Sequence, residues 1–349
     1  MKILFLANWQ RTRAKGGDYA FFEHYKERPE LRVLTTFRIP LITWLERRVL
    51  KFYVLQALAA WWMSARFDLV IAYSSQCGLP LGMIRRILGT RGVPLVIHDI
   101  ENFCRLTGIA RRAAGFALKS AQRIVTPSSE QVGQYAGISD DAARKAVHIE
   151  IGIGPYEEAP ALADALQDSR IAVIGKADQG PRFRDWHTLL QALVRVKRQY
   201  ELLIIGRDAL PEADRGGVEL PERTRFVPYT PAARLVPVLG TCRLAVLPLP
   251  ERGQSQGQLT ALFCMACGRP LIATGVMGLG DYVEHERTGL LYKPGDADDL
   301  ARSIERLLSD DELSLDLGRR AHDAVVERFT DRAMAQQWEE LCREVVLKP

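Results

Sequence analysis

Residues 69–99 read LVIAYSSQCGLPLGMIRRILGTRGVPLVIHD and contain two apolar runs, LVIAYS (69–74) and PLVIHD (94–99), with a helix-length segment between them. Apolar runs without alternating polar positions are typical of strands buried on both faces of a parallel sheet. Two such strands joined by a helix form a right-handed βαβ unit. This stretch therefore predicts an open, doubly wound α/β sheet.

The same alternation of apolar runs and helical segments fills the rest of the chain. The predicted strands of the first series are residues 3–7, 32–37, 69–74, 94–99, 123–128 and 147–152, and those of the second are 170–175, 201–206, 224–229, 244–249, 270–274 and 289–293. Residues 155–169 are acidic, rich in Ala and interrupted by two Pro, which favours a linker. We expect two Rossmann-like domains, over residues 1–160 and 170–330.

Composition supports a folded chain with two cores. The 349 residues are 47% hydrophobic and 26% charged, enough for two cores of roughly 150 to 200 residues each. The 27 Gly and 18 Pro show no fixed period. A small module, a repeat protein and a largely disordered chain are therefore excluded.

The net charge of +5 is unevenly distributed. Residues 1–150 contain 22 Lys and Arg against 12 Asp and Glu, whereas residues 151–349 contain 25 against 30. The basic first part predicts an anionic ligand or surface on that side. The mildly acidic second part argues against nucleic acid as a partner.

Six scattered cysteines and the start MKILFLANW, which reads as a strand rather than a signal peptide, predict a cytoplasmic protein with reduced thiols. Cys264 and Cys267 are spaced like half of a zinc site, but no second Cys or His pair follows them. We interpret both as buried helix residues and expect no metal.

The turn Gly257–Thr260 directly precedes a helical run over residues 261–268. The backbone N–H groups and the positive end of such a helix favour an anion. Gly lets the backbone approach a phosphate, and the Thr hydroxyl adds a donor or a helix cap. The alternative is that the two residues form only a turn and a cap.

Lys176 and Arg184 lie on the predicted loop between the strand 170–175 and its helix. A point charge and a planar guanidinium together suit the neutralisation of a diphosphate leaving group. The alternative is two solvated loop cations. Trp186 and His187, at the predicted helix start, are interpreted as packing residues.

These segments resemble the carboxyl-terminal domain of the glycosyltransferase family 4 enzymes. MACGRPLIAT (265–274), GDYVEHERTGLLYKPGDADDLARSIERLL (280–308) and LGRRAHDAVVERF (317–329) follow the family pattern in order and at the right distances. The resemblance implies a GT-B fold, with two Rossmann-like domains facing across a cleft and residues 331–349 packing back on the first. It also implies retaining, metal-independent transfer of a sugar from a nucleotide-diphosphate sugar to a hydroxyl acceptor.

The resemblance implies roles for particular residues. Lys176 and Arg184 would contact the donor diphosphate and His98 would lie beside the donor sugar, which makes these three the expected catalytic residues; alternatively, His98 is a strand-end residue satisfied by backbone. The other expected donor contacts are Gly16, Gly17, Tyr229, Ser255, Gly257, Gln258, Leu259 and Thr260, and the expected acceptor contacts are Arg11, Arg13, Asp99 and Glu101. The loop around Gly16 could instead be only a mobile basic loop.

One departure from the family concerns two glutamates, the second of which binds the donor ribose. Ser255 and Phe263 occupy those places here, and Phe263 cannot accept a hydrogen bond from a ribose diol. A degenerate, non-catalytic protein that binds nucleotide sugars or glycans is therefore the alternative function. The motifs resemble those of a nucleotide-sugar epimerase less closely. The sequence also lacks the glycine fingerprint that a nicotinamide-dependent oxidoreductase needs.

The expected partners follow from this interpretation. The nucleotide sugar is a substrate, so no cofactor is expected, and the acceptor is a glycan, a lipid-linked molecule or a small molecule. Residues 42–65 combine Trp, Phe and Tyr with Arg and Lys, which favours an interfacial helix on an anionic membrane surface at its inner, cytoplasmic face. A helix packed inside the first domain explains the same residues.

Overall fold

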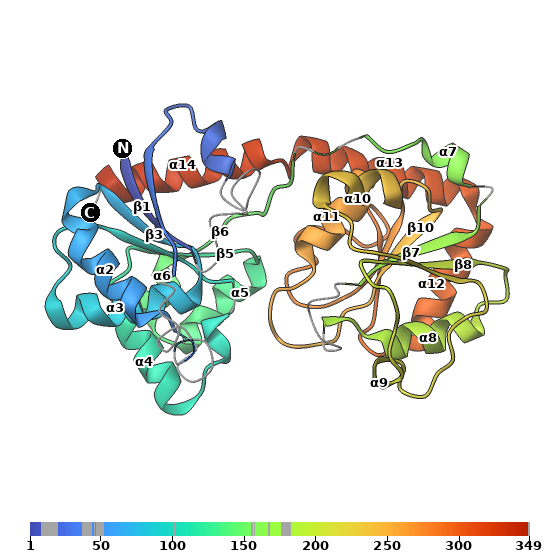
Figure 1. Ribbon diagram of the computed structural model, residues 1–349, viewed down its shortest axis with the longest axis horizontal. Coiled ribbons are helices and arrows are strands. Elements are labelled where there is room, and N and C mark those ends of the chain that lie inside the picture. The colour runs from blue at the N-terminus through green and yellow to red at the C-terminus, as the bar shows by residue number, and fades with distance from the viewer. Residues whose placement is uncertain are drawn as a thin grey trace. The chain divides into compact units, whose positions relative to one another are not determined.

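The computed structural model describes residues 1–7, 20–36, 44, 46, 52–100, 102–154, 156, 158–166, 168–175 and 183–347. The chain forms two compact units (Figure 1). The amino-terminal unit comprises Met1–Glu150 together with Asp331–Pro349, and the carboxyl-terminal unit is Ile151–Thr330. The sequence placed this division later, with residues 151–160 in the first domain.

The amino-terminal unit is built on a parallel six-stranded sheet with the order β2-β1-β3-β4-β5-β6. Its strands are β1 (Lys2–Leu6), β2 (Glu30–Leu34), β3 (Leu69–Ala72), β4 (Leu95–His98), β5 (Arg123–Thr126) and β6 (Ala146–His148). Every residue of β3 and β4 is buried, as the unbroken apolar runs predicted. The order reverses at β1, so this sheet is doubly wound.

Helices cover both faces of this sheet. One face packs against α2 (Val54–Met63), α3 (Ser75–Leu88), α4 (Gly108–Leu118), α5 (Ser129–Gln134) and α6 (Asp140–Lys145), with short 3₁₀ turns at Ser64–Arg66, Phe103–Arg105 and Tyr135–Gly137. The other face packs against η2 (Ala20–His24) and the last helix, α14 (Asp331–Leu347). The backbone N–H of Lys26 donates to Glu339 Oε2 of α14 at 2.9 Å, which ties this helix to the unit.

The carboxyl-terminal unit repeats the design with the order β12-β11-β10-β7-β8-β9. Its strands are β7 (Arg170–Ile174), β8 (Glu201–Ile205), β9 (Thr224–Val227), β10 (Leu244–Leu247), β11 (Leu271–Thr274) and β12 (Leu290–Tyr292). One face packs against α10 (Ala232–Leu239), α11 (Gln258–Ala266) and α13 (Asp311–Glu327). The other face packs against α8 (Trp186–Arg195) and α12 (Ala297–Ser309). Two further helices, α7 (Leu162–Ala165) and α9 (Glu212–Arg215), are single turns. The predicted α/β class is confirmed in both units.

Residues 151–169 belong to the carboxyl-terminal unit by their contacts. Ile153 forms a parallel bridge with Thr330, and the Ile151 N–H donates to the Tyr282 hydroxyl at 2.9 Å. Because these bonds precede the acidic segment, the chain enters its second unit before the predicted linker begins.

The segment 42–65 is not one interfacial helix in its described part. Phe52 and Tyr53 lie outside helical structure, and α2 begins only at Val54. The inner face of α2 is buried, and Gln56 Nε2 donates to the carbonyl oxygens of Ala7 and Leu34 at 2.8 and 2.7 Å. A helix packed on the first unit therefore describes this segment better. Among the described helices, none has both the length and the apolar character needed to cross a membrane.

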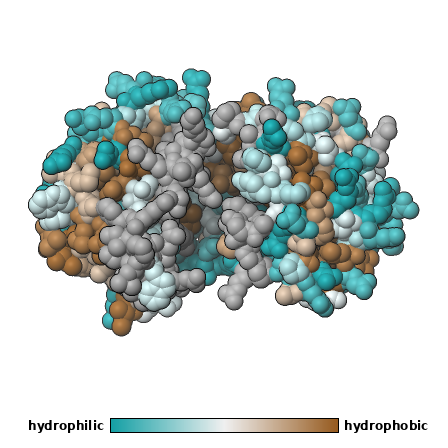
Figure 2. Space-filling model, in the orientation of Figure 1, coloured by the Kyte–Doolittle hydropathy of each residue, from teal (hydrophilic) through white to brown (hydrophobic). Residues whose placement is uncertain are grey.

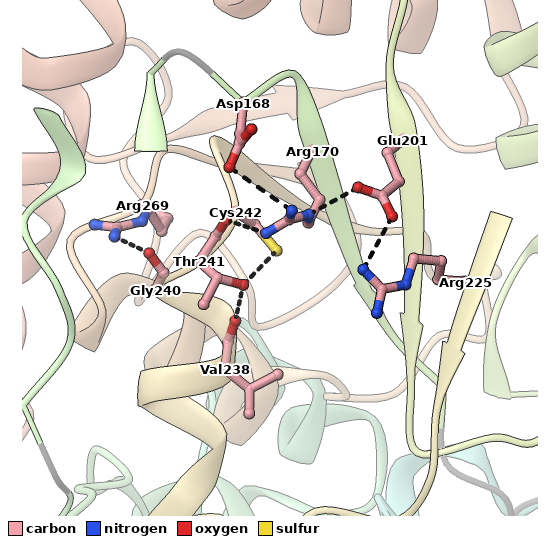
Figure 3. Close-up of polar contacts among 9 residues, drawn as sticks. All are labelled: Asp168, Arg170, Glu201, Arg225, Val238, Gly240, Thr241, Cys242 and Arg269. Atoms are coloured by element: carbon pink, nitrogen blue, oxygen red, sulfur yellow. Dashed lines mark hydrogen bonds and ion pairs between the residues drawn. The ribbon is translucent and has the colours of Figure 1, made fainter. Parts of the chain in front are cut away.

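An ion-pair cluster fixes the amino-terminal ends of strands β7 and β8 (Figure 3). Arg170 Nε donates to Glu201 Oε2 at 3.0 Å and Arg170 Nη1 to the Thr241 carbonyl at 2.9 Å. Arg225 Nη1 lies 3.5 Å from the second oxygen of Glu201. The hydrogen bond from Arg170 lowers the pKa of Glu201.

This cluster predicts a pH-dependent contribution to stability. Because the pKa of Glu201 is lower in the folded chain, its pair stabilises the fold above the unfolded pKa of about 4.3 and is lost as the pH falls through the folded pKa. Glu201→Gln should lower the free energy of unfolding by on the order of 1 kcal/mol at neutral pH, and by less at acid pH. Urea unfolding at both pH values measures this.

The exposed Glu222→Gln is the matched control and should leave the unfolding midpoint unchanged. A loss of stability in Glu201→Gln that is equally large at acid pH would contradict the role of the ion pair.

Candidate functional site

The candidate site begins where β10 leads into α11. Gly257 has a φ of 86°, and a Cβ atom there would lie 2.6 Å from Leu249 Cδ1, so glycine is strongly favoured at this position. The helix starts at Gln258, and no side chain caps it. Its first backbone N–H groups have no acceptor within the helix and carry the positive end of the helix dipole.

Arg184 joins this helix start to the carboxyl end of β7. Its Nε donates to the Ile174 carbonyl at 2.8 Å, and its Nη2 donates to Thr260 Oγ1 at 3.3 Å. Nη1 donates to the Phe183 carbonyl at 2.8 Å, so three of its five N–H groups have acceptors among the described residues. Thr260 lies inside the helix and accepts from Arg184, so it is not a helix cap.

The charge of Arg184 is buried without a compensating carboxylate. The side chain is 9% exposed, and no described carboxylate lies within ion-pair distance of it. The pKa of Arg184 is lowered to about 10, mainly by burial and also by the neighbouring Arg207, while Cys264 opposes the shift. The group is still a cation at neutral pH. A buried, unpaired charge is costly, and a bound anion would offset that cost.

Two polar side chains beside Gly257 are also unsatisfied. Ser255 is 8% exposed and Gln258 is 5% exposed. Ser255 Oγ and Gln258 Nε2 are buried and have no hydrogen-bond partner among the described residues. A buried polar group without a partner costs about 1 to 3 kcal/mol. These groups, the bare helix start and Arg184 together form a candidate anion site in the carboxyl-terminal unit.

Two further cations near this site were missed in the sequence. Arg207, directly after β8, donates to Asp214 Oδ2 at 2.7 Å, and its guanidinium lies 5.6 Å from the Trp186 ring. Arg252, on the loop after β10, stacks 5.2 Å from the ring of Phe183. A cation at the carboxyl end of a predicted parallel strand was the available signal for Arg207.

The remaining donor predictions have different outcomes. Tyr229 follows β9 and is 78% exposed, so its ring is free to stack on a planar ligand. Leu259 is half-exposed on the first turn of α11. Phe263 is half-buried and packs against the apolar core on this face of the sheet. Outside the described residues lie Lys176, Gly16, Gly17, Arg11, Arg13 and Glu101.

His98 ends β4 in the amino-terminal unit and is enclosed by aromatic rings. Its ring centroid lies 4.5 Å from that of Tyr73 and 5.4 Å, edge to face, from that of Trp338 on α14. Its Nδ1 is buried and has no partner among the described residues, so backbone does not satisfy this atom. Burial lowers the pKa of His98 to about 3, which leaves a neutral imidazole at physiological pH.

Asp99 does not fit the predicted contact with an acceptor. It is fully buried. Its carboxylate accepts from Ser75 Oγ at 2.9 Å, from the Phe103 N–H at 2.8 Å, from Gln131 Nε2 and from the Tyr135 hydroxyl. These bonds join the end of β4 to the start of α3 and to the helices that follow β4. Asp99 therefore has a structural role, because no surface of it is open to a substrate.

Other features of the described residues do not extend the site. No group of three or more His, Cys, Asp or Glu side chains in the described part of the chain is placed to hold a metal ion. A cavity of about 640 Å³ is lined by Tyr156, Cys267, Arg269 and His322, among others. It lies at the carboxyl end of α11, whereas the anion site lies at its amino end.

The two parallel sheets and the anion site define a two-domain α/β protein of the GT-B class, and solved structures support this. HepE of Anabaena, crystallised with UDP and glucose, has a TM-score of 0.72 at 18% identity, with 98% of this chain and 99% of that chain covered. Sucrose-phosphate synthase of Thermosynechococcus elongatus has a TM-score of 0.75 at 20% identity, with full coverage of both chains. The chain has the GT-B fold, as predicted.

Sequence comparison places the carboxyl-terminal unit more narrowly. Residues 168–310 match the family model of the glycosyl transferases group 1. N-acetyl-alpha-D-glucosaminyl L-malate synthase of Bacillus anthracis is 36% identical over 88 residues, 25% of this chain and 23% of that protein. D-inositol 3-phosphate glycosyltransferase of Corynebacterium jeikeium is 28% identical over 248 residues, 66% of this chain and 53% of that protein. The chain thus matches less than two thirds of each relative.

The backbone at Gly257 provides a test of the site's geometry. In Gly257→Ala a Cβ would meet Leu249 at a residue whose φ is positive, so we expect a loss of about 1 to 3 kcal/mol in unfolding free energy. Gly253→Ala is the matched control for φ, because Gly253 also has a positive φ but open space around its Cβ. Thermal unfolding of both variants measures the difference. Equal losses would show that contact with Leu249 is unimportant.

The burial of His98 predicts its titration. The imidazole should titrate near pH 3 in the folded chain. Its signal in the proton NMR spectrum is identified as the one that is missing from the spectrum of His98→Gln. Because unfolded histidine binds a proton below about pH 6.5, His98 should reduce stability as the pH falls from there toward 3. A His98 signal that titrates between pH 6 and 7 would contradict the enclosed environment.

Proposed function

We propose that the protein is a glycosyltransferase that moves a sugar from a nucleotide-diphosphate sugar to a hydroxyl acceptor. The observation that carries this proposal is the buried guanidinium of Arg184 beside the uncapped start of α11, without a carboxylate partner among the described residues. The family of residues 168–310 and the fold support it. A diphosphate is the group that such a pocket suits best.

The anion site would act on the leaving group. When the bond between the sugar C1 and the diphosphate oxygen breaks, negative charge builds on that oxygen. Arg184 and the first N–H groups of α11 are fixed in place before the reaction, so they stabilise this charge without reorganising. Lys176, from the sequence resemblance, is proposed as a second cation at the same diphosphate.

His98 is proposed to lie beside the donor sugar. A neutral imidazole can donate or accept a hydrogen bond at a sugar hydroxyl without adding a charge. The new bond joins C1 to the acceptor oxygen, and the proton of the acceptor hydroxyl leaves with the diphosphate. The resemblance favours retention of configuration and chemistry that needs neither a metal nor a cofactor. Polysaccharide, glycolipid or glycoconjugate biosynthesis is the proposed setting, with a glycan, lipid-linked or small-molecule acceptor.

The donor nucleotide is proposed from a structural neighbour. HepE was crystallised with UDP and glucose, and with UDP-glucose, which makes UDP-glucose the first donor to test. Tyr229 offers an exposed ring after β9 for a nucleobase. Ser255 and Phe263 stand where the family has glutamates. We therefore propose that the contacts to the donor differ here from the family pattern.

A non-catalytic sugar-nucleotide or glycan binder is the second candidate. The observation that favours it is the apolar packing of Phe263, which leaves the family's ribose contact unmade. Such a protein would bind a nucleotide sugar through the same anion site but would release no nucleoside diphosphate.

The proposed location is the cytoplasm. All six cysteines are free thiols, five of them buried, which suits a reducing compartment. Association with the inner face of a membrane is part of this proposal and depends on a separate surface of the amino-terminal unit.

Turnover tests the role of Arg184. The protein is incubated with UDP-glucose and a panel of other nucleotide sugars, and release of nucleoside diphosphate is measured. Arg184→Gln should lower kcat by about 100- to 1000-fold, because charge on the leaving oxygen would lose its fixed donor. Lys176→Ala should lower it in the same direction.

Arg302→Gln is the matched control, since Arg302 is exposed on α12. Unchanged turnover in both Arg184→Gln and Lys176→Ala would remove the phosphate assignment. Nucleotide-sugar binding without any turnover in the wild-type protein would favour the non-catalytic candidate.

A further inference from the structure

Exposed apolar side chains gather on one surface of the amino-terminal unit, at helices α2, α3 and α4. Trp62, Ile87 and Leu88 are 67%, 69% and 53% exposed. We name this surface the α2–α4 patch, and its apolar members are Leu58, Trp62, Met83, Ile87, Leu88 and Phe116. Figure 2 shows hydrophobic side chains on this part of the unit. Large exposed apolar side chains that gather in this way mark an interaction surface.

The members of the patch are joined by contacts between the three helices. Trp61 Nε1 of α2 donates to the Gly89 carbonyl at the end of α3 at 2.8 Å. The guanidinium carbon of Arg91, just after α3, lies 4.1 Å from the Trp61 ring centroid and 5.2 Å from that of Trp62. Arg86 of α3 lies 5.3 Å from the ring of Phe116 on α4. Cations and aromatic rings therefore alternate across one continuous surface.

The charge of this region is strongly one-sided. Residues 69–129 contain eight Lys and Arg, and their only acidic residues are Asp99 and Glu101. Two of the eight cations add nothing to the surface charge, because Arg85 is buried and Arg123 pairs with Glu344. Asp99 is fully buried, so it cannot neutralise a surface cation. Neither Arg86 nor Arg91 forms an ion pair with any described carboxylate. The patch is therefore both apolar and positively charged.

We propose that the α2–α4 patch docks on an anionic lipid bilayer. Trp and Arg are suited to the boundary between headgroups and acyl chains, where a ring is partly buried and a guanidinium contacts phosphate. Ile87 and Leu88 would insert between the acyl chains, while Arg86 and Arg91 bind lipid phosphates. This surface uses α2 but otherwise differs from the predicted interfacial helix over residues 42–65.

The same charges disfavour a second copy of this chain as the occupant. In a twofold dimer through the patch, the arginines of one copy would face those of the other without acidic residues between them. Nucleic acid would use the cations but would leave the exposed Ile87 and Leu88 without an apolar partner. An anionic surface with an apolar interior uses both halves of the patch.

Vesicle sedimentation tests this proposal independently of any glycosyltransferase activity. The probes are vesicles of equal parts phosphatidylglycerol and phosphatidylcholine, and vesicles of phosphatidylcholine alone. The wild-type chain should bind the anionic vesicles at low salt and release them at high salt. The double variant Arg86→Gln, Arg91→Gln should bind at least tenfold more weakly, from about fivefold for each cation. Trp62→Ser combined with Ile87→Ser should weaken binding by about tenfold or more.

Two substitutions on the carboxyl-terminal unit serve as controls. Val194→Ser replaces a 71% exposed apolar residue on α8, and Arg302→Gln replaces an exposed cation on α12. Both should bind vesicles like the wild type, and circular dichroism checks that every variant is folded. The proposal is overturned if the wild type fails to bind anionic vesicles at low salt, or if the patch variants bind as well as the controls. A dimer that Trp62→Ser with Ile87→Ser dissociates, without vesicle binding, would assign the patch to self-association instead.

Discussion

The hydrogen bonds of Arg184 to the end of β7 and to Thr260 in the first turn of α11 determine the shape of the candidate site. They place a cation at the point where a parallel strand ends and a helix begins. The charge of Arg184 and the dipole of α11 therefore both favour an anion. Glycine is favoured at 257 because a side chain there would be strained by the positive φ and would press on Leu249. The core of the carboxyl-terminal unit holds these parts in place, and its stability offsets the cost of the unpaired charge.

Buried polar groups near the carboxyl ends of the strands are of two kinds: some are bonded within the fold, and others keep unused donors or acceptors. In the amino-terminal unit, Asp99 is fully hydrogen-bonded and holds β4 against neighbouring helices. In the carboxyl-terminal unit, Arg184, Ser255 and Gln258 keep unused donors or acceptors. Each unmet group costs on the order of 1 kcal/mol or more, a cost that a bound ligand would remove. Such groups also occur at His98 and Gln56, so what favours a binding site here is that they gather beside a bare helix start and a buried cation.

The sequence predicted the fold more fully than the site. Unbroken apolar runs such as residues 95–97 are typical of buried parallel strands, and each predicted strand overlaps an observed one. The burial of Asp99 could not be predicted, because its partners Ser75 and Tyr135 lie far away in the sequence. The same holds for Trp338, which reaches His98 from the last helix. Such contacts depend on packing between elements, and local patterns do not encode them.

A crystal structure of the protein with UDP shows directly whether the anion site binds a diphosphate. If this site holds the donor, diphosphate oxygens will lie within hydrogen-bond distance of the Arg184 guanidinium and of the backbone N–H groups of Gln258 to Thr260. Ser255 or Gln258 will also gain a partner. A diphosphate bound elsewhere, with Arg184 still bonded only to protein oxygens, would contradict the account.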